Sequence, residues 1–230
     1  MLAKKKKLSK KEIKEDQLVT SYYQSLEFIE QYKSKLIIAA AAIAVVVLAV
    51  LLYTNKIEED NTAANEALSR VIPLYDNNQF EQAINGQPGT TLIGLKEIVD
   101  QYSGTTNGEI AKFYLANSYF FTGEYQSALE VYQDFNGDDE LLRAGAISGS
   151  ANCYEALGQN EKAAELYYQA SQVSEYNPDN AENLLLAGKN YLTAGQNEKS
   201  AEVLNELKAN YKTSASAREA DRYLAEANMM

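Results

Sequence analysis

Residues 36–53 form an unbroken run of 18 uncharged residues, made of Leu, Ile, Ala and Val with one tyrosine at its end. A helix of this length rises about 27 Å, close to the roughly 30 Å hydrocarbon core of a bilayer. Helices buried in globular domains rarely extend this far without a polar residue. The run therefore predicts one membrane-spanning helix, which separates a short N-terminal segment from a long C-terminal one.

The charges on the two sides of this run have opposite signs. Residues 1–35 carry nine lysines and five acidic residues, a balance of +4, whereas residues 54–230 carry 12 basic and 27 acidic residues, a balance of −15. Basic residues that flank a span stay in the cytoplasm because they resist translocation and favour the anionic inner leaflet. We therefore expect a single-pass membrane protein, with a cytoplasmic N-terminus and residues 54–230 on the other side of the membrane.

The apolar run is expected to remain as a signal anchor. The apolar region of a cleaved signal peptide is usually about 7–15 residues long, lies near the start of the chain and precedes a small-residue cleavage site. Here the run is longer, begins only at residue 36 and is followed by Thr54-Asn55-Lys56-Ile57. The chain's one cysteine is Cys153, far from the run, so a lipoprotein anchor is not expected either.

The composition disfavours several classes of function. With no histidine and one cysteine, the chain cannot supply Ser-His or Cys-His catalytic pairs or the common zinc sites. No pair of carboxylates and no cofactor loop stands out, so we expect no enzyme, no cofactor, no metal and no small-molecule substrate. The balance of −15 would repel the phosphate backbone of nucleic acids. Cys153 is expected to be a buried, inert thiol.

Residues 1–35 are expected to form a basic amphipathic helix on the cytoplasmic side. Apolar and aromatic residues recur there at spacings of three and four, opposite a face of Lys, Glu and Gln. The stripe comprises Val19, Tyr22, Tyr23, Leu26, Ile29 and Tyr32. Such a helix fits the inner leaflet or the cytoplasmic loops of a partner, or it merely positions the anchor.

Three stretches of the C-terminal segment share one pattern, at residues 116–132, 151–167 and 188–204. Each has a small residue, a tyrosine three residues later, a glycine four residues further, a second small residue after five more and a large residue after another four. The glycines, spaced 35 and 37 residues apart, predict helical hairpins in which glycine ends the first helix. A period near 34 residues with these positions resembles the tetratricopeptide repeat.

The sequence thus predicts an all-α protein, in which a single N-terminal transmembrane helix precedes a tetratricopeptide-repeat α-solenoid. In the first repeat, which is degenerate, Pro73 is expected to interrupt the first helix and residues 85–89 to break the second, with a helix resuming near Leu92. The expected segments are a linker helix with the degenerate repeat at 54–104, three repeats at 105–213, and a solvating cap helix at 214–230.

In this repeat family the first helices line a concave groove, which nominates a partner-binding surface. The candidate residues are Phe113, Asn117, Phe120, Phe121, Ser148, Asn152, Glu155, Leu185, Lys189 and Leu192. Asn117, Asn152 and Lys189 match relatives that clamp acidic C-termini, but Phe113 and Leu185 stand where two further cations would be. The expected ligand is therefore an apolar segment or a helix of another protein. Alternatively, the three phenylalanines belong to the core between repeats.

The order of basic head, single span and acidic repeat body resembles the ancillary subunit of the bacterial Sec translocon. The Lys-rich start, residues 8–16 and residues 93–99 are similar to the version found in Bacteroidetes-type bacteria. The resemblance implies partnership with Sec translocon subunits and with a membrane-anchored periplasmic chaperone that has prolyl-isomerase-like domains. The implied role is to help emerging secreted proteins pass into the periplasm. A cell-envelope scaffold for division or outer-membrane assembly machinery is the alternative.

Overall fold

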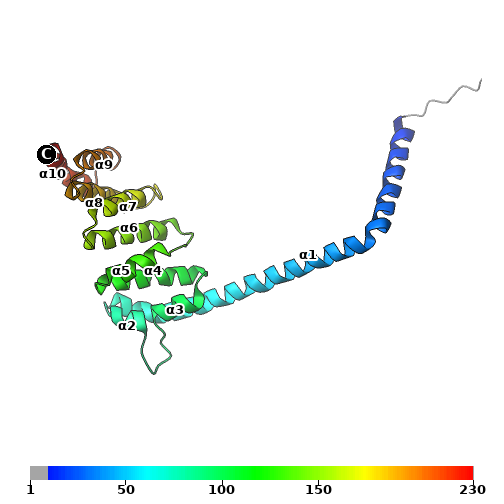
Figure 1. Cartoon of the computed structure of the whole chain (residues 1–230), viewed down its shortest axis with the longest axis horizontal. Coiled ribbons are helices and arrows are strands. Elements are labelled where there is room, and N and C mark those ends of the chain that lie inside the picture. Colours follow the sequence, from blue (N-terminus) through cyan, green and yellow to red (C-terminus); the bar gives the residue numbers. More distant parts are fainter. Residues whose placement is uncertain (1–9, 230) are drawn as a thin grey trace, which may run out of the picture. The chain divides into compact units, whose positions relative to one another are not determined.

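The computed structural model describes residues 10–229, which form helices α1 to α10 joined by turns and loops (Figure 1). In this part of the chain the extended pairing is one isolated antiparallel bridge, between Gly86 and Ile93. The chain divides into two compact units, one up to Lys56 and one from Ile57 onwards. The predicted fold class is confirmed, since the described residues are all-α and one apolar N-terminal helix precedes a solenoid of helical hairpins.

The first unit consists of the part of α1 (Lys10–Asp76) that lies before Ile57. Residues 36–53 are exposed along their whole length and bury nothing against the described chain. By length and composition this stretch is able to cross a membrane as a single-pass anchor. The tyrosines of the head, Tyr22 and Tyr23, are also 62% and 65% exposed. The Lys-rich start of the head, which includes Lys4 to Lys7, lies outside the described residues.

Helix α1 continues through Pro73 to Asp76, so the predicted interruption at Pro73 is wrong. Proline inside a helix removes the hydrogen bond that its amide would donate four residues back. Pro73 lies in the last turn of α1 with its ring exposed, so the helix loses that bond without disturbing its packing. The buried side chains of Leu68 and Val71, 3% and 0% exposed, hold the same helix against the core.

In the second unit the helices stack in chain order (Figure 1). The hairpins are α4 (Thr106–Phe121) with α5 (Tyr125–Gln133), α6 (Glu140–Ala156) with α7 (Asn160–Ser171), and α8 (Asn180–Thr193) with α9 (Asn197–Asn210). The end of α1 forms a shorter hairpin with α2 (Phe80–Asn85), while α3 (Leu95–Tyr102) packs on α4, and α10 (Ala215–Met229) packs on α8 and α9. Helix α3 begins after the predicted Leu92 because the Gly86–Ile93 bridge keeps the preceding residues extended.

The hairpin turns repeat with the same backbone geometry. Gly123, Gly158 and Gly195 have φ values of 84°, 73° and 75°, in the left-handed region, as the pattern predicts. Each glycine N–H donates to the carbonyl three residues back, and the following N–H donates to the carbonyl five residues back, at 2.8–3.0 Å. After α1, Asn78 takes the place of glycine with φ 58° and makes the same two bonds. Asparagine tolerates this backbone region, so the degenerate repeat retains its turn.

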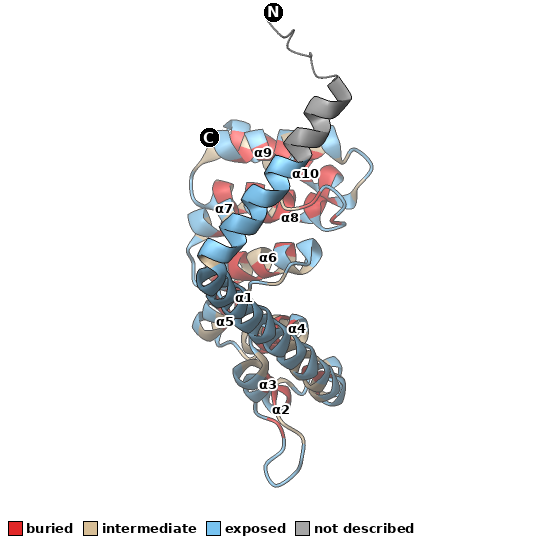
Figure 2. Cartoon of the chain, turned by 90° about the vertical axis from the view of Figure 1, so that its right-hand side faces the viewer, coloured by how far each residue is buried: buried red, intermediate tan, exposed pale blue. Residues whose placement is uncertain are grey.

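The small residues of the pattern are buried where the two helices of a hairpin meet. The first helices contribute Ala116, Ala151 and Gly188, and the second contribute Ala128, Ala163 and Ser200. A Cβ added at Gly188 would lie 2.5 Å from Leu204, so only glycine permits this approach. Burial follows the facing sides of the stacked helices (Figure 2). The resulting hydrophobic core holds each hairpin against its neighbours.

Candidate functional site

Nine aromatic rings connect α1, α2, α4 and α5 into one network in the described part of the chain. Neighbouring ring centroids lie 4.8–6.5 Å apart, within the range of favourable aromatic contacts. The rings belong to Tyr75, Phe80, Phe113, Tyr114, Phe120, Phe121, Tyr125, Tyr132 and Phe135. The helix ends of the first two hairpins therefore meet through aromatic side chains.

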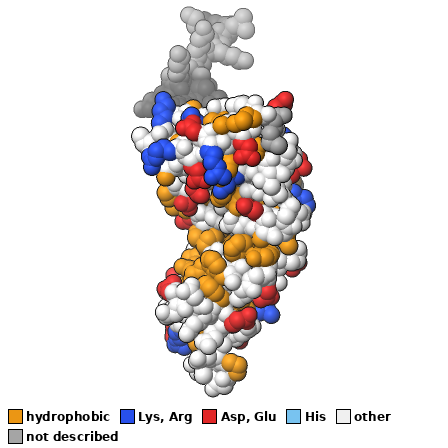
Figure 3. Space-filling view, turned by 90° about the vertical axis from the view of Figure 1, so that its left-hand side faces the viewer, with side chains coloured by type: hydrophobic (Ala, Val, Ile, Leu, Met, Phe, Trp, Pro, Cys, Tyr) orange, Lys and Arg blue, Asp and Glu red, His pale blue; other side chains and the backbone are white. Residues whose placement is uncertain are grey.

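The network reaches the surface at Phe121, which is 57% exposed. Its ring stacks on Phe80 at 4.8 Å and 21°, and Phe120 packs beside it and against Tyr125 at 5.4 Å. On the face shown in Figure 3, hydrophobic side chains gather at the level of α4 and α5, whereas charged side chains dominate the end formed by α8–α10. Phe113 is half-buried between Tyr132 and Phe135 and belongs to the core of this region.

Asn117 and Asn152 each accept a hydrogen bond from a tyrosine in the second helix of the same repeat. The donors are the hydroxyl groups of Tyr132 and Tyr167, 15 residues further along the chain. Burial raises the pKa of both tyrosines, because their rings are only 5% and 1% exposed and the phenolate would lose its hydration. Asn117 and Asn152, which match the clamp of acidic C-termini in sequence, are therefore hydrogen-bonded within their own repeats.

Ser148 and Glu155 connect the repeat formed by α6 and α7 to the repeat formed by α8 and α9. The Ser148 hydroxyl donates to the side-chain oxygen of Asn183 at 2.9 Å. The carboxylate of Glu155 accepts hydrogen bonds from the Asn190 amide at 3.0 Å and from the Tyr167 hydroxyl at 2.8 Å. The bonds to Asn183 and Asn190 each link residues 35 apart, on the successive first helices α6 and α8, so they fix the register between these repeats.

The candidates of the third repeat divide between core and surface. Leu185 is 2% exposed and packs in the core, so its prediction as a residue of the partner-binding surface is wrong. The side chain at this position points between helices because Leu184 and Leu185 are both needed to fill the contact with the neighbouring hairpin. The Lys189 ammonium lies 5.4 Å from the ring centroid of Tyr223, on α10, and Leu192 is half-buried.

The sequence interpretation missed Tyr75, Phe80 and Tyr125 as surface aromatics beside Phe121. The repeat phase contains a signal for two of them, since Phe80 follows Asn78 by two residues as Tyr125 follows Gly123. Placement of Tyr75 depends on α1 continuing past Pro73. Its ring then lies 5.4 Å from Phe80 and 4.9 Å from Tyr114.

Lys112, at the base of the α4–α5 hairpin, lies in an ion cluster with the buried Glu109 and the exposed Asp134. Its side chain is 7% exposed, and its ammonium lies 3.0 Å from Glu109 and 2.7 Å from Asp134. Burial acts to lower the pKa of Lys112, but hydrogen bonds from the ammonium to Asp134 and Glu109 outweigh it and leave the pKa raised. Glu109 also accepts from the Asn136 amide at 2.8 Å. The cluster thus fastens α4 to the end of α5.

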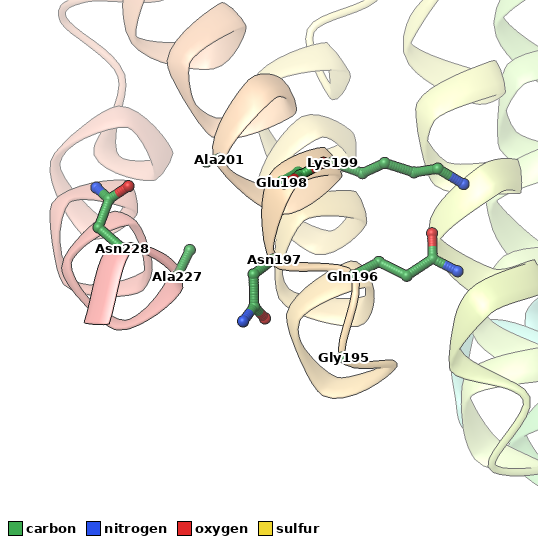
Figure 4. A pocket seen from close by; sticks show the side chains of 8 residues that line it. All are labelled: Gly195, Gln196, Asn197, Glu198, Lys199, Ala201, Ala227 and Asn228. Carbon is green, nitrogen blue, oxygen red and sulfur yellow. The ribbon is translucent and has the colours of Figure 1, made fainter. Parts of the chain in front are cut away.

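An open pocket of about 750 Å³ lies between the start of α9 and the end of α10 (Figure 4). Gln196 and Lys199 extend away from α10, where they contact Glu161 and the ring of Tyr191. The remaining lining consists of small or amide side chains and the carboxylate of Glu198. Among the side chains that the structure describes, residues 19–229, no group of three or more Cys, Asp and Glu is placed to bind a metal ion.

Two stretches of the chain, residues 111–137 and 182–214, match the tetratricopeptide repeat family model. They cover most of the α4–α5 hairpin and the α8–α9 hairpin. The second unit is therefore a solenoid of helical hairpins, two of which match the tetratricopeptide repeat. This fold typically serves as an interaction scaffold rather than as an enzyme.

Solved structures support the repeat fold. The chain is similar to the nearly identical TPR-like repeats of a Podosopora anserina protein described as a kinesin light chain, with 19% identity, a TM-score of 0.54, and coverage of 74% of this chain and 87% of the other. The Q17M form of that protein gives the same identity and TM-score, with 86% of its chain covered. At this identity the likeness concerns the fold alone. No curated protein matches the chain.

Proposed function

We propose that this chain is a membrane-anchored protein–protein interaction scaffold of the bacterial inner membrane. The observation that carries the proposal is the exposed apolar stretch at residues 36–53, in the same helix that opens the tetratricopeptide solenoid. A stretch of this kind is stable in lipid and costly in water. The solenoid exposes Phe121, stacked on the half-buried Phe80, and aromatic side chains of this kind anchor protein interfaces.

The finer proposal is an ancillary subunit of the Sec translocon. The span docks beside translocon subunits, and the solenoid, in the periplasm, brings a membrane-anchored chaperone to emerging secreted proteins. The support is the resemblance of the basic head, single span and acidic repeat body, together with the basic residues on one side of the span. The candidate contacts are the exposed members of the predicted groove, led by Phe121.

Site-specific photocrosslinking in native membranes tests this proposal. A photoreactive residue at Leu48, within the span, is expected to capture translocon subunits, and one at Phe121 is expected to capture a periplasmic chaperone. A matched probe at Tyr176, which is 83% exposed, controls for random collision. Capture of division or outer-membrane assembly proteins at both positions would replace the translocon role with the envelope-scaffold alternative.

Topology is tested separately with an impermeant maleimide. In a Cys153→Ala background, Asp138→Cys is expected to react in intact spheroplasts, because Asp138 is exposed in the solenoid. Ser21→Cys, in the exposed head, is expected to react only after the membrane is opened. The reverse labelling pattern would invert the proposed orientation.

A further inference from the structure

The surface aromatics of the first two hairpins form one continuous feature, which we name the aromatic surface. It consists of Tyr75, Phe80, Phe120, Phe121 and Tyr125, connected ring to ring at 4.8–6.5 Å. Rings that serve only as core are buried, but Phe121 is 57% exposed and the other four are only half-buried. Exposed aromatic groups of this size usually mark interaction sites.

The repeat fold does not require aromatic residues at these positions. The α6–α7 and α8–α9 hairpins have the same turn geometry with non-aromatic residues there. Ala156 and Thr193 replace Phe121, and Asn160 and Asn197 replace Tyr125. Comparison of hairpins within this chain therefore shows that the hairpin turn forms without the aromatic side chains of the aromatic surface.

The part of the solenoid that carries the aromatic surface is strongly acidic. Residues 57–137 contain three basic and twelve acidic residues, a balance of −9. Two of the three cations are already paired, Lys112 in its buried cluster with Glu109 and Asp134, and Arg70 with Glu66. A partner at this surface therefore meets mostly unneutralised carboxylates.

Carboxylates also lie directly beside the rings. Asp76, Glu81 and Glu124 are exposed, and each is adjacent in the chain to a ring of the aromatic surface. Burial raises the pKa of nearby Tyr119, and the charges of Glu124, Asp100 and Glu81 raise it further, as expected for a concentration of negative charge. Charge complementarity consequently favours a cationic partner and disfavours an acidic one.

We infer that the aromatic surface docks an amphipathic segment of a partner protein, with large apolar side chains on one face and lysine or arginine beside them. The apolar side chains pack on Phe80 and Phe121, and the cations pair with the surrounding carboxylates. This inference rests on the proposed scaffold function and names the chemistry of the segment that the scaffold holds.

The test uses the full chain in nanodiscs of zwitterionic lipid and three fluorescent 18-residue peptides. One peptide places Leu at helical spacing with Lys on the flanks, the second replaces every Lys with Glu, and the third keeps the first composition in scrambled order. Fluorescence anisotropy is read against empty nanodiscs, which subtracts binding to lipid. The Leu/Lys peptide is expected to bind at least tenfold more tightly than the other two, and more weakly as salt is raised.

The matched variant Phe121→Ala/Tyr125→Asn copies Ala156 and Asn160 of the α6–α7 hairpin, so its helices have a precedent in the same chain. It is expected to lose at least tenfold in affinity for the Leu/Lys peptide, while Tyr176→Ala, at an exposed ring elsewhere, leaves binding unchanged. Equal binding of the Leu/Glu peptide to the unmodified chain, or an absence of binding, overturns the inference without any variant. Such a result does not affect the crosslinking test of the translocon role, so failure of this inference can be told apart from failure of the proposed function.

Discussion

At the scale of single residues, the turn glycines are the positions where side-chain identity is most tightly set by backbone conformation. Gly158 has φ 73° and no neighbouring atom within 4 Å of an added Cβ, so a substitution there meets only backbone strain. Gly158→Ala is expected to lower the free energy of unfolding by about 1–2 kcal/mol. Gly158→Asn should lower it by less, because Asn78 occupies the equivalent turn at φ 58°. Urea unfolding in a mild detergent measures both, and equal losses for Ala and Asn would contradict the strain argument.

A second prediction at residue scale concerns the hydroxyl of Tyr167. This group donates to Glu155 at 2.8 Å and also bonds Asn152, while the ring is 1% exposed. Tyr167→Phe is expected to lower the free energy of unfolding by about 1–3 kcal/mol, because the hydrogen bonds to Asn152 and to the charged Glu155 are both lost. Tyr176→Phe is the matched control, since that ring is 83% exposed, and should change it by less than about 0.5 kcal/mol. If Tyr176→Phe lowers the free energy of unfolding as much as Tyr167→Phe does, burial of the Tyr167 hydroxyl is not the cause of the loss.

At the scale of helices and hairpins, the ion cluster at Lys112 fastens one pair of elements. Lys112→Met keeps most of the apolar stem but leaves Glu109, whose side chain is 11% exposed, without its cation. The expected loss in the free energy of unfolding is about 3 kcal/mol, because removal of one partner leaves an uncompensated buried charge. Arg70→Ala, which breaks an exposed pair with Glu66, should cost less than about 1 kcal/mol.

The double variant Glu109→Gln/Lys112→Met separates the contribution of charge from that of packing. It removes the orphaned carboxylate and is expected to recover part of the stability lost in Lys112→Met. Thermal unfolding followed by circular dichroism is sufficient to rank the variants. If the double variant is less stable than Lys112→Met, the charge imbalance is not the cause of the loss.

The hairpins were predictable from the sequence because their determinants are local. The small, tyrosine and glycine positions act within a helix pair and its turn, so Gly123, Gly158 and Gly195 already located the three turns. The prediction that Pro73 interrupts the helix was wrong because it rested on a local rule about proline. Burial of the neighbouring Val71 against the solenoid keeps α1 helical beyond Pro73. Tertiary packing outweighs one lost hydrogen bond.

The site was less predictable because it depends on which side chains meet across elements. Neither the bond from Tyr132 to Asn117 nor the burial of Leu185 follows from residue type and spacing alone. Asn117 and Leu185 both occupy groove positions in the repeat pattern. In the structure, Asn117 is hydrogen-bonded within its own repeat and Leu185 is buried in the core. Phe121 was identified, but its partner Phe80 lies in a degenerate repeat whose continuity only the structure shows.

At the scale of the whole molecule, buried thiol and phenol groups predict a loss of stability at alkaline pH. The chain contains no histidine, so stability should be nearly constant between pH 6 and 8. Burial raises the pKa of the Cys153 thiol to about 12, and burial also raises the pKa of Tyr132 and Tyr167. In the unfolded chain a thiol titrates near ~8.5 and a tyrosine near ~10.

For each of these groups the folded pKa lies above the unfolded one, so the folded state binds the proton more tightly. The stabilising contribution is complete below the unfolded pKa and is lost as pH rises through the folded value. The midpoint of thermal unfolding should therefore fall from about pH 9 and more steeply above about pH 10. Cys153→Ala should delay the onset of this fall, since the side chain is fully buried and Ala cannot ionise. A decline between pH 6 and 8, or an unchanged midpoint up to pH 11, would show that these buried groups do not govern the stability of the solenoid.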